Sequence, residues 1–236
     1  MTDQIKEKHD RQIRSFVRRD GRITPGQSAA LEELFPVWGL ESDIHSSDQW
    51  AFDWAEIFGN DKSPVFEIGF GNGGNLLRQA AARPGDNFVG IEVYRSGCGQ
   101  VLMEAKKSGL GNIRVICEDA VQVLSKRVAD QSLNETWLFF PDPWHKKRHN
   151  KRRIIQPEFA ALVASKLVAG GFFQMATDWA PYAEHMLETM NAAPSFANTN
   201  SKNSYIPRPD NRILTHFEQR GLNKGHEVAD LLYQKK

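Results

Sequence analysis

Short apolar segments rich in β-branched and aromatic residues alternate with helical segments along most of this 236-residue chain. The joints between them are short and contain glycine, proline and acidic residues. Such alternation predicts an α/β fold with a mostly parallel sheet, right-handed crossovers and helices on both faces. We expect the five parallel strands at residues 64–69, 87–93, 113–117, 137–140 and 172–176.

Two segments near the carboxyl end, residues 195–199 and 228–233, also have the character of strands. A long insertion separates them, so we expect an antiparallel edge that completes a seven-stranded sheet. An insertion there can cover the carboxyl ends of the strands, where such sheets bind ligands. The dense apolar run from Trp50 to Phe58 predicts a helix, with the preceding Ser46 and Ser47 as caps, and apolar spacing predicts others at 76–83, 96–108, 121–128, 157–169 and 181–190.

The first 24 residues have few apolar side chains but many lysines and arginines, and Thr24-Pro25-Gly26 is expected to end any local order. We therefore predict a flexible basic arm at residues 1–24 and a single catalytic domain at 25–236.

No apolar run approaches the roughly 18 residues that a membrane span needs, and the amino end lacks the apolar core of a signal peptide. The sequence predicts a soluble, cytoplasmic protein, either a monomer or a homodimer.

Cys98 and Cys117 are the only cysteines, and neither lies in a C-x-x-C or zinc-binding spacing. His145 and His149 stand four residues apart, but the three cations between them disfavour a metal ion. Neither a disulfide framework nor a metal cofactor is expected.

An aspartate between two prolines, Asp142, stands where the fourth strand ends, and a strongly basic run follows it. Each proline fixes its own φ and restricts the residue before it, so Asp142 is expected in a stiff extended segment. The net charge is only +1, but the positive charge is concentrated here. This predicts an active-site edge beside a strip that binds RNA through Arg148, His149, Asn150, Lys151, Arg152 and Arg153.

Residues 69–74 fit the pattern G-x-G-x-x-G, in which Gly69 and Gly71 let the backbone approach a ligand closely. The pattern alone suggests a dinucleotide, so a nicotinamide-dependent oxidoreductase is one alternative. Acids at four successive strand ends favour S-adenosylmethionine instead, because carboxylates suit its sulfonium and ribose hydroxyls and would repel a pyrophosphate. These acids are Glu67, Glu92, Asp119 and Asp142.

Five motifs together resemble the bacterial tRNA (guanine-N7-)-methyltransferase family, the TrmB type, from about residue 24 to the end. They are Glu67-Ile68-Gly69-x-Gly71, Gly90-Ile91-Glu92-Val93, the block from Phe140-Pro141-Asp142-Pro143-Trp144 to Arg153, Thr177-Asp178, and Thr215-x-Phe217-Glu218. The Pro-Asp-Pro-Trp block is highly specific, whereas very many methyltransferases share the glycine motif. The amino acids at residues 73–75 and 96–100 differ from those that are usual in the family at these turns.

The resemblance implies a class I S-adenosylmethionine-dependent methyltransferase (Rossmann-like) fold. It also implies methylation of N7 of the variable-loop guanine of tRNA, position 46 in tRNA numbering. Cofactor contacts are implied at Glu67, Glu92, Asp119 and Asp142, and substrate contacts at Lys146, Asp178, Thr215, His216, Phe217 and Glu218.

Guanine N7 has a lone pair and no proton, so it can attack the sulfonium methyl by in-line displacement without a general base. Asp142 is predicted to be the catalytic residue, through positioning and through stabilising the positive purine. Asp178 or Glu218 is predicted to read the guanine edge. A noncatalytic RNA-binding module on a methyltransferase fold is the second alternative.

Overall fold

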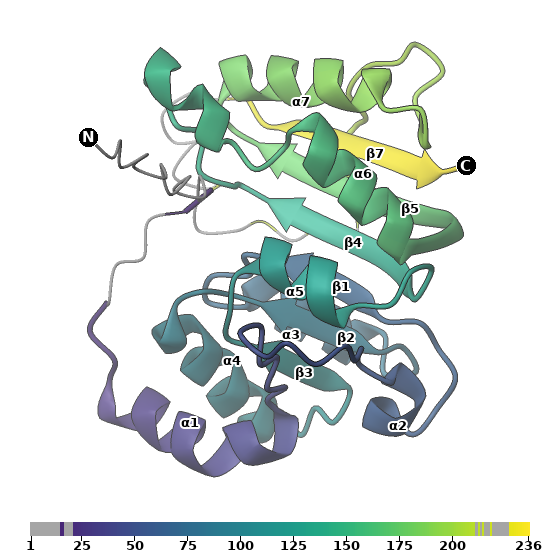
Figure 1. Cartoon of the computed structure of the whole chain (residues 1–236). Coiled ribbons are helices and arrows are strands. Elements are labelled where there is room, and N and C mark those ends of the chain that lie inside the picture. The colour runs from purple at the N-terminus through teal and green to yellow at the C-terminus, as the bar shows by residue number, and fades with distance from the viewer. Residues whose placement is uncertain (1–14, 17–20, 211, 213, 215–217, 219–226) are drawn as a thin grey trace, which may run out of the picture.

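The computed structural model describes residues 15–16, 21–210, 212, 214, 218 and 227–236 (Figure 1). Within these residues one mixed sheet has seven strands, in the order β3-β2-β1-β4-β5-β7-β6. Pairings among β1 to β5 are parallel, and β7 lies antiparallel between β5 and β6. The predicted fold is confirmed. The strands are β1 (Val65–Ile68), β2 (Phe88–Ile91), β3 (Ile113–Ile116), β4 (Leu133–Phe139), β5 (Leu167–Thr177), β6 (Phe196–Asn198) and β7 (Ala229–Lys235).

Helices cover both faces of the sheet (Figure 1). One face is covered by α1 (Pro25–Trp38), α3 (Gly74–Ala82) and α4 (Arg95–Lys107). The other is covered by α2 (Trp54–Phe58), α5 (Ala120–Arg127), α6 (Pro157–Lys166) and α7 (Ala180–Ala192). Neighbouring residues of β1 point to opposite faces, so Val65 joins the first apolar core and Phe66 the second.

Helix α1 begins at the place where the sequence was expected to lose order. The Thr24 hydroxyl accepts a hydrogen bond from the Gln27 N–H at 3.3 Å, and the Gln27 side chain accepts one from the Thr24 N–H at 3.0 Å. These reciprocal bonds form a capping box, and Pro25 suits the first helical position because its missing N–H would have no helical partner there. The expectation for Thr24-Pro25-Gly26 was therefore wrong.

Two helix boundaries also differ from the predicted ones. Ser46 does not cap a helix; its hydroxyl accepts from the Asp48 N–H within a turn, and α2 begins only after Asp53, whose carboxylate accepts from the Glu56 N–H at 3.1 Å. Helix α6 ends at Lys166 instead of reaching Gly170, because Leu167 already pairs with β4.

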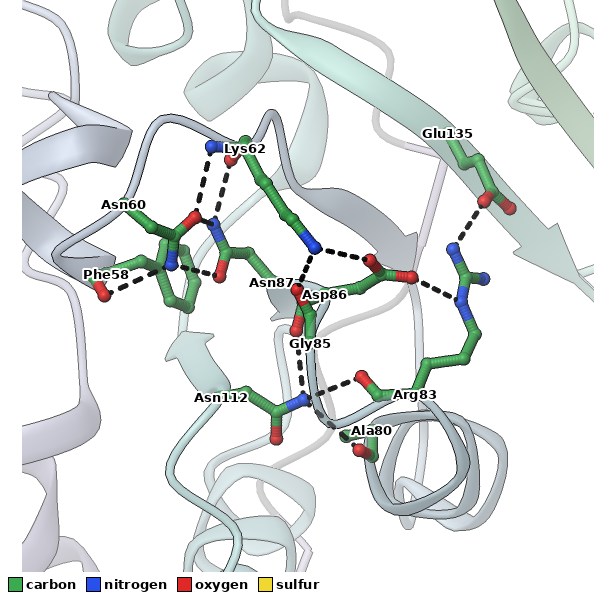
Figure 2. A network of polar contacts seen from close by, with 10 residues as sticks. All are labelled: Phe58, Asn60, Lys62, Ala80, Arg83, Gly85, Asp86, Asn87, Asn112 and Glu135. Atoms are coloured by element: carbon green, nitrogen blue, oxygen red, sulfur yellow. Dashed lines mark hydrogen bonds and ion pairs between the residues drawn. The ribbon is translucent and has the colours of Figure 1, made fainter.

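A polar network ties together the loops at the amino edge of the sheet, where the parallel strands begin (Figure 2). Arg83, just after α3, donates to Asp86 at 2.7 Å and to Glu135 of β4 at 2.8 Å. Lys62 lies 3.5 Å from the other oxygen of Asp86. The Asn112 amide donates to the carbonyls of residues 80, 83 and 86. These bonds fix the ends of β1, β2 and β4, and so help to position the opposite edge.

Candidate active site at the carboxyl edge of the sheet

A cavity of about 390 Å³ lies at the carboxyl ends of β1 to β4. The glycine turn after β1, the residues after β2 and β3, and the segment from Leu138 to Asp142 line it. Crossover connections bring these segments together at one edge, which is where open parallel sheets bind ligands. The predicted residues Gly69, Gly71, Glu92, Asp119 and Asp142 all line this cavity.

The glycine turn is shaped for close approach of a ligand to the backbone. Gly71 has a φ of +59°, a conformation that glycine adopts without the strain a side chain would add. Its N–H donates to the Glu92 carboxylate at 2.9 Å. A Cβ at Gly97, in the first turn of α4, would collide with the Gly71 carbonyl oxygen, so α4 packs directly against the turn.

Glu92 stands just beyond β2 and is buried, although it lines the cavity. Besides Gly71, the N–H groups of Val93 and Tyr94 donate to its carboxylate at 2.7 and 3.2 Å. Burial raises the pKa of Glu92; the backbone hydrogen bonds oppose that rise, and the nearby charge of Asp142 adds to it. The carboxylate is held in a fixed orientation, and its remaining acceptor capacity suits a hydroxyl donor such as that of a ribose.

Glu118, Asp119 and Asp142 are the other acids that line the cavity. Asp119 caps α5, and its carboxylate accepts from the Val121 N–H at 2.9 Å. Asp142 is exposed at the cavity. The residues on either side of its Pro-Asp-Pro segment, Phe140 and Trp144, both have left-handed φ values, +50° and +49°. Such strain in non-glycine residues is concentrated at functional sites, where the surrounding structure enforces it.

Glu67, the fourth predicted acid, is not among the residues that line the cavity. It is fully buried within β1, and Asn75 of α3 donates to it at 3.2 Å. Burial raises the pKa of Glu67 to about 8, and the Asn75 hydrogen bond offsets only part of that rise. At neutral pH this side chain is mostly an uncharged acid behind the glycine turn, so the ionised lining comes from the other acids.

The basic block after Asp142 folds as a 3-10 helix, Lys147–Arg152. The guanidinium of Arg152 stacks 3.8 Å from the centroid of the Trp144 ring, and the Trp144 indole donates to the Ser15 carbonyl at 2.9 Å. Ser15 and Phe16 also line the cavity. Lys146, Lys147, Arg148 and Lys151 are exposed, as a docking strip for phosphates requires.

Arg153 differs from the rest of the predicted RNA-binding set, because only 5% of it is exposed. It donates to the carbonyls of Pro143 at 3.0 Å and Pro181 at 3.2 Å, and it lies over the Tyr182 ring. Its guanidinium therefore supports the Pro-Asp-Pro segment from inside. Only the tertiary structure distinguishes Arg153 from its neighbours, since in the sequence it is one more cation in a basic run.

The predicted substrate residues fall into three groups. Lys146 is exposed and Asp178 follows β5 at the same edge of the sheet as Asp142. Thr215, His216 and Phe217 lie outside the described residues. Glu218 is buried, and both of its oxygens accept hydrogen bonds from Arg212, which the sequence did not single out. No local pattern marks Arg212, because its partners Glu218 and Asp230 lie 6 and 18 residues further along the chain.

The sequence matches the family described as "Putative methyltransferase" over residues 61–231. It is 53% identical over 226 residues to a tRNA (guanine-N(7)-)-methyltransferase of Vibrio cholerae, covering 95% of this chain and 92% of that protein. It is 53% identical over 228 residues to the protein of the same name from Pseudoalteromonas translucida, covering 97% and 92%. A Klebsiella pneumoniae protein of that name is 52% identical over 225 residues, covering 95% and 92%.

Solved structures show the same architecture at low sequence identity. The 16S rRNA methyltransferase KamB superimposes with a TM-score of 0.58 at 17% identity, covering 78% of this chain and 94% of that one. A mutant 16S rRNA (adenine(1408)-N(1))-methyltransferase of Catenulisporales acidiphilia, solved with its cosubstrate SAM, gives 0.52 at 14% identity, covering 77% and 89%. These likenesses establish a class I methyltransferase fold. Within the described residues, no helix combines the length and apolar character that crossing a membrane requires.

Proposed function

The chain belongs to the tRNA (guanine-N7-)-methyltransferase family, and on that premise we propose that it methylates N7 of the variable-loop guanine of tRNA, at position 46, with S-adenosylmethionine as donor. The proposed partner is tRNA, and the proposed place of action is the cytoplasm. One observation carries the proposal: a single cavity combines an acidic lining with an edge at Asp142 that continues into an exposed basic strip.

The cavity fits the proposed donor. Its volume of about 390 Å³ lies within the usual range for small-ligand sites. The Glu92 carboxylate, oriented by three backbone N–H groups, suits a ribose hydroxyl. Carboxylates in the lining favour a cation and disfavour a pyrophosphate, which argues against the nicotinamide alternative. When bound, S-adenosylmethionine supplies an electrophilic methyl group on a sulfonium.

Asp142 and its neighbours carry the proposed chemistry. Because guanine N7 has no proton, the protein must align the nucleophile with the methyl group and stabilise the positive charge that the purine gains. The Asp142 carboxylate, exposed at the cavity edge on a segment constrained by two prolines, is suited to both tasks. Asp178, at the end of β5, is the proposed reader of the guanine edge.

Nucleoside analysis of a tRNA transcript incubated with the protein and donor tests the proposal. We expect 7-methylguanosine in the intact transcript and none when guanine 46 is replaced by adenine. Absence of 7-methylguanosine from the intact transcript would contradict the proposed function. Formation of 7-methylguanosine in the transcript that has adenine at position 46 would contradict the proposed position. Equilibrium binding of S-adenosylhomocysteine against NAD tests the donor separately.

A further inference from the structure

Arg212 is a buried arginine held between two carboxylates. Its guanidinium donates to Glu218 at 2.6 and 3.0 Å and to Asp230 of β7 at 2.6 and 2.8 Å. The side chains of all three residues are at most 2% exposed. Burial alone would lower the pKa of Arg212, but its hydrogen bonds and the charges of its two partners outweigh burial and raise it. A planar fork that binds two carboxylates at once has one geometry, which lysine cannot reproduce.

The pairing changes what Glu218 can do. Both of its oxygens already accept from Arg212, and Arg208 approaches one of them at 3.7 Å. Only 2% of the Glu218 side chain is exposed, so direct contact with a guanine edge would require the carboxylate to move and its charge-assisted hydrogen bonds to rearrange, which is costly. The geometry favours a supporting role for Glu218 over base reading.

Arg212 also connects to the two strand ends that carry the proposed catalytic and substrate acids. Its guanidinium carbon lies 5.6 Å from the centroid of the Phe140 ring, which lines the cavity two residues before Asp142. Its partner Asp230 pairs across the sheet with Ala176, two residues before Asp178. Arg212 therefore binds Glu218 directly, and it contacts Phe140 and Asp230, which lie beside the strand ends that carry the other two acids.

We propose that Arg212 is a positioning residue for methyl transfer: it fixes Glu218 and, through Asp230 and Phe140, the strand ends that present Asp178 and Asp142. This inference rests on the proposed function, and it assigns Glu218 an indirect role in place of contact with guanine. Loss of the fork displaces groups at the substrate side of the cavity, whereas Glu92 and the glycine turn, which face the donor, keep their own hydrogen bonds.

The first test is Arg212→Lys, which keeps the charge but loses the fork. We expect S-adenosylhomocysteine to bind with unchanged Kd and full stoichiometry, while kcat for tRNA methylation falls by about 10- to 100-fold. The matched control is Arg127→Lys. Arg127 is equally buried and donates to the carbonyls of Ser42, Asp43 and Asp48, away from the cavity. We expect this control to lose stability without losing kcat per folded molecule.

A double-mutant cycle separates positioning through the pair from direct contact by Glu218. If Glu218 acts through Arg212, the Arg212→Lys/Glu218→Gln variant loses no more kcat than the worse single variant. Losses that multiply would overturn the proposal, as would wild-type kcat in Arg212→Lys. If Arg212→Lys fails to bind S-adenosylhomocysteine stoichiometrically, Asp230→Asn replaces it with the same expectations. A wild-type protein that makes no 7-methylguanosine defeats the proposed function itself, whereas a normal wild type with normal variants defeats only the positioning role.

Discussion

The two edges of the central sheet are both rich in charged side chains but pair them differently. At the amino edge, Arg83 lies between Asp86 and Glu135 (Figure 2). Burial would raise the pKa of Asp86, but Arg83 and Lys62 outweigh it and hold that pKa below its usual value. At the carboxyl edge the balance is reversed, since burial raises the pKa of Glu92 and the charge of Asp142 adds to the rise.

The difference separates stability from function within one sheet. Ion pairs at the amino edge connect loops and lie outside the cavity, so they stabilise the fold and do not act on a ligand there. Carboxylates at the carboxyl edge lie close to one another, and Phe140 and Trp144 are strained beside them. Both features cost stability and are typical of sites where charge acts on a ligand. Substitutions in the ion pairs of the amino edge should therefore lower stability and leave kcat unchanged, whereas substitutions of the cavity acids at the carboxyl edge should lower kcat.

The largest expected effect follows from removing the charge of Asp142. Asp142→Asn keeps the shape of the side chain but removes the carboxylate that stabilises the methylated purine, so kcat should fall by about 10²- to 10³-fold. Single-turnover methylation of a tRNA transcript measures it. Asp86→Asn is the same substitution at the amino edge, and there we expect a lower melting temperature with unchanged kcat. Near-normal turnover in Asp142→Asn would remove this residue from the mechanism.

A pH-dependent gain in stability is expected from Glu67→Gln. The pKa of Glu67 rises from about 4.5 in the unfolded chain to about 8 in the fold, so the folded protein binds the extra proton between these values. Its contribution to the free energy of unfolding is therefore full below pH 4.5 and falls by up to about 1.4 kcal/mol per pH unit until pH 8. Glu67→Gln removes that decline and should be the more stable protein near pH 8.

Urea denaturation of Glu67→Gln and the wild type at pH 5, 6.5 and 8 measures this difference. Glutamine can also donate to the Asn75 side-chain oxygen, a buried atom for which the described residues provide no hydrogen-bond partner. The contrast at the amino edge is Glu135→Gln, which loses its ion pair with Arg83 and should be destabilised at pH 8. Parallel pH profiles of Glu67→Gln and the wild type would contradict the raised pKa.

A loss of stability is expected when Arg83 is replaced by methionine. Arg83→Met keeps the apolar stem but leaves Asp86 and Glu135 without their shared cation, which should cost about 1–3 kcal/mol of unfolding free energy. Lys107→Met is the control, because the Lys107 side chain is 77% exposed and its ammonium lies 3.9 Å from Glu104, an ion pair that contributes little to stability. Both variants should keep the wild-type kcat. A drop in kcat for Arg83→Met would show that the amino edge does more than hold the fold.

The sheet and most of the cavity could be predicted from the sequence, because they depend on local patterns. Alternating strands and helices require crossovers, and crossovers gather the residues after parallel strands at one edge. Glu92 and Asp119 were found this way, since each stands just beyond its strand. Glu67 looked equivalent, but both the predicted strand at 64–69 and β1 contain it, and its side chain lies under α3. Glu67 stands one residue before the end of β1, whereas Glu92 stands one residue after the end of β2. A shift of two positions relative to the strand end thus separates a buried acid from one in the cavity.

Tertiary pairing accounts for most of what the sequence did not reveal. Arg212 and Asp230 are 18 residues apart and share no periodic pattern, and Arg153 resembles the exposed cations beside it until the fold buries it. The start of α1 is a different case. Thr24 and Gln27 stand at the spacing of a capping box, so a local signal for that helix was present in the sequence.

The smallest expected effect concerns the salt dependence of tRNA binding. Lys147 and Lys151 are exposed on the basic strip beside Asp142, so each is placed to neutralise one phosphate. Each lost phosphate contact should lower the log-log salt slope by about 0.7 to 0.9, so Lys147→Gln/Lys151→Gln should lower it by roughly 1.5. Lys106→Gln/Lys107→Gln removes the same charge at the end of α4, towards the amino edge, and should leave the slope unchanged. Equal slopes for the two double variants would show that long-range charge, and not the strip itself, attracts tRNA.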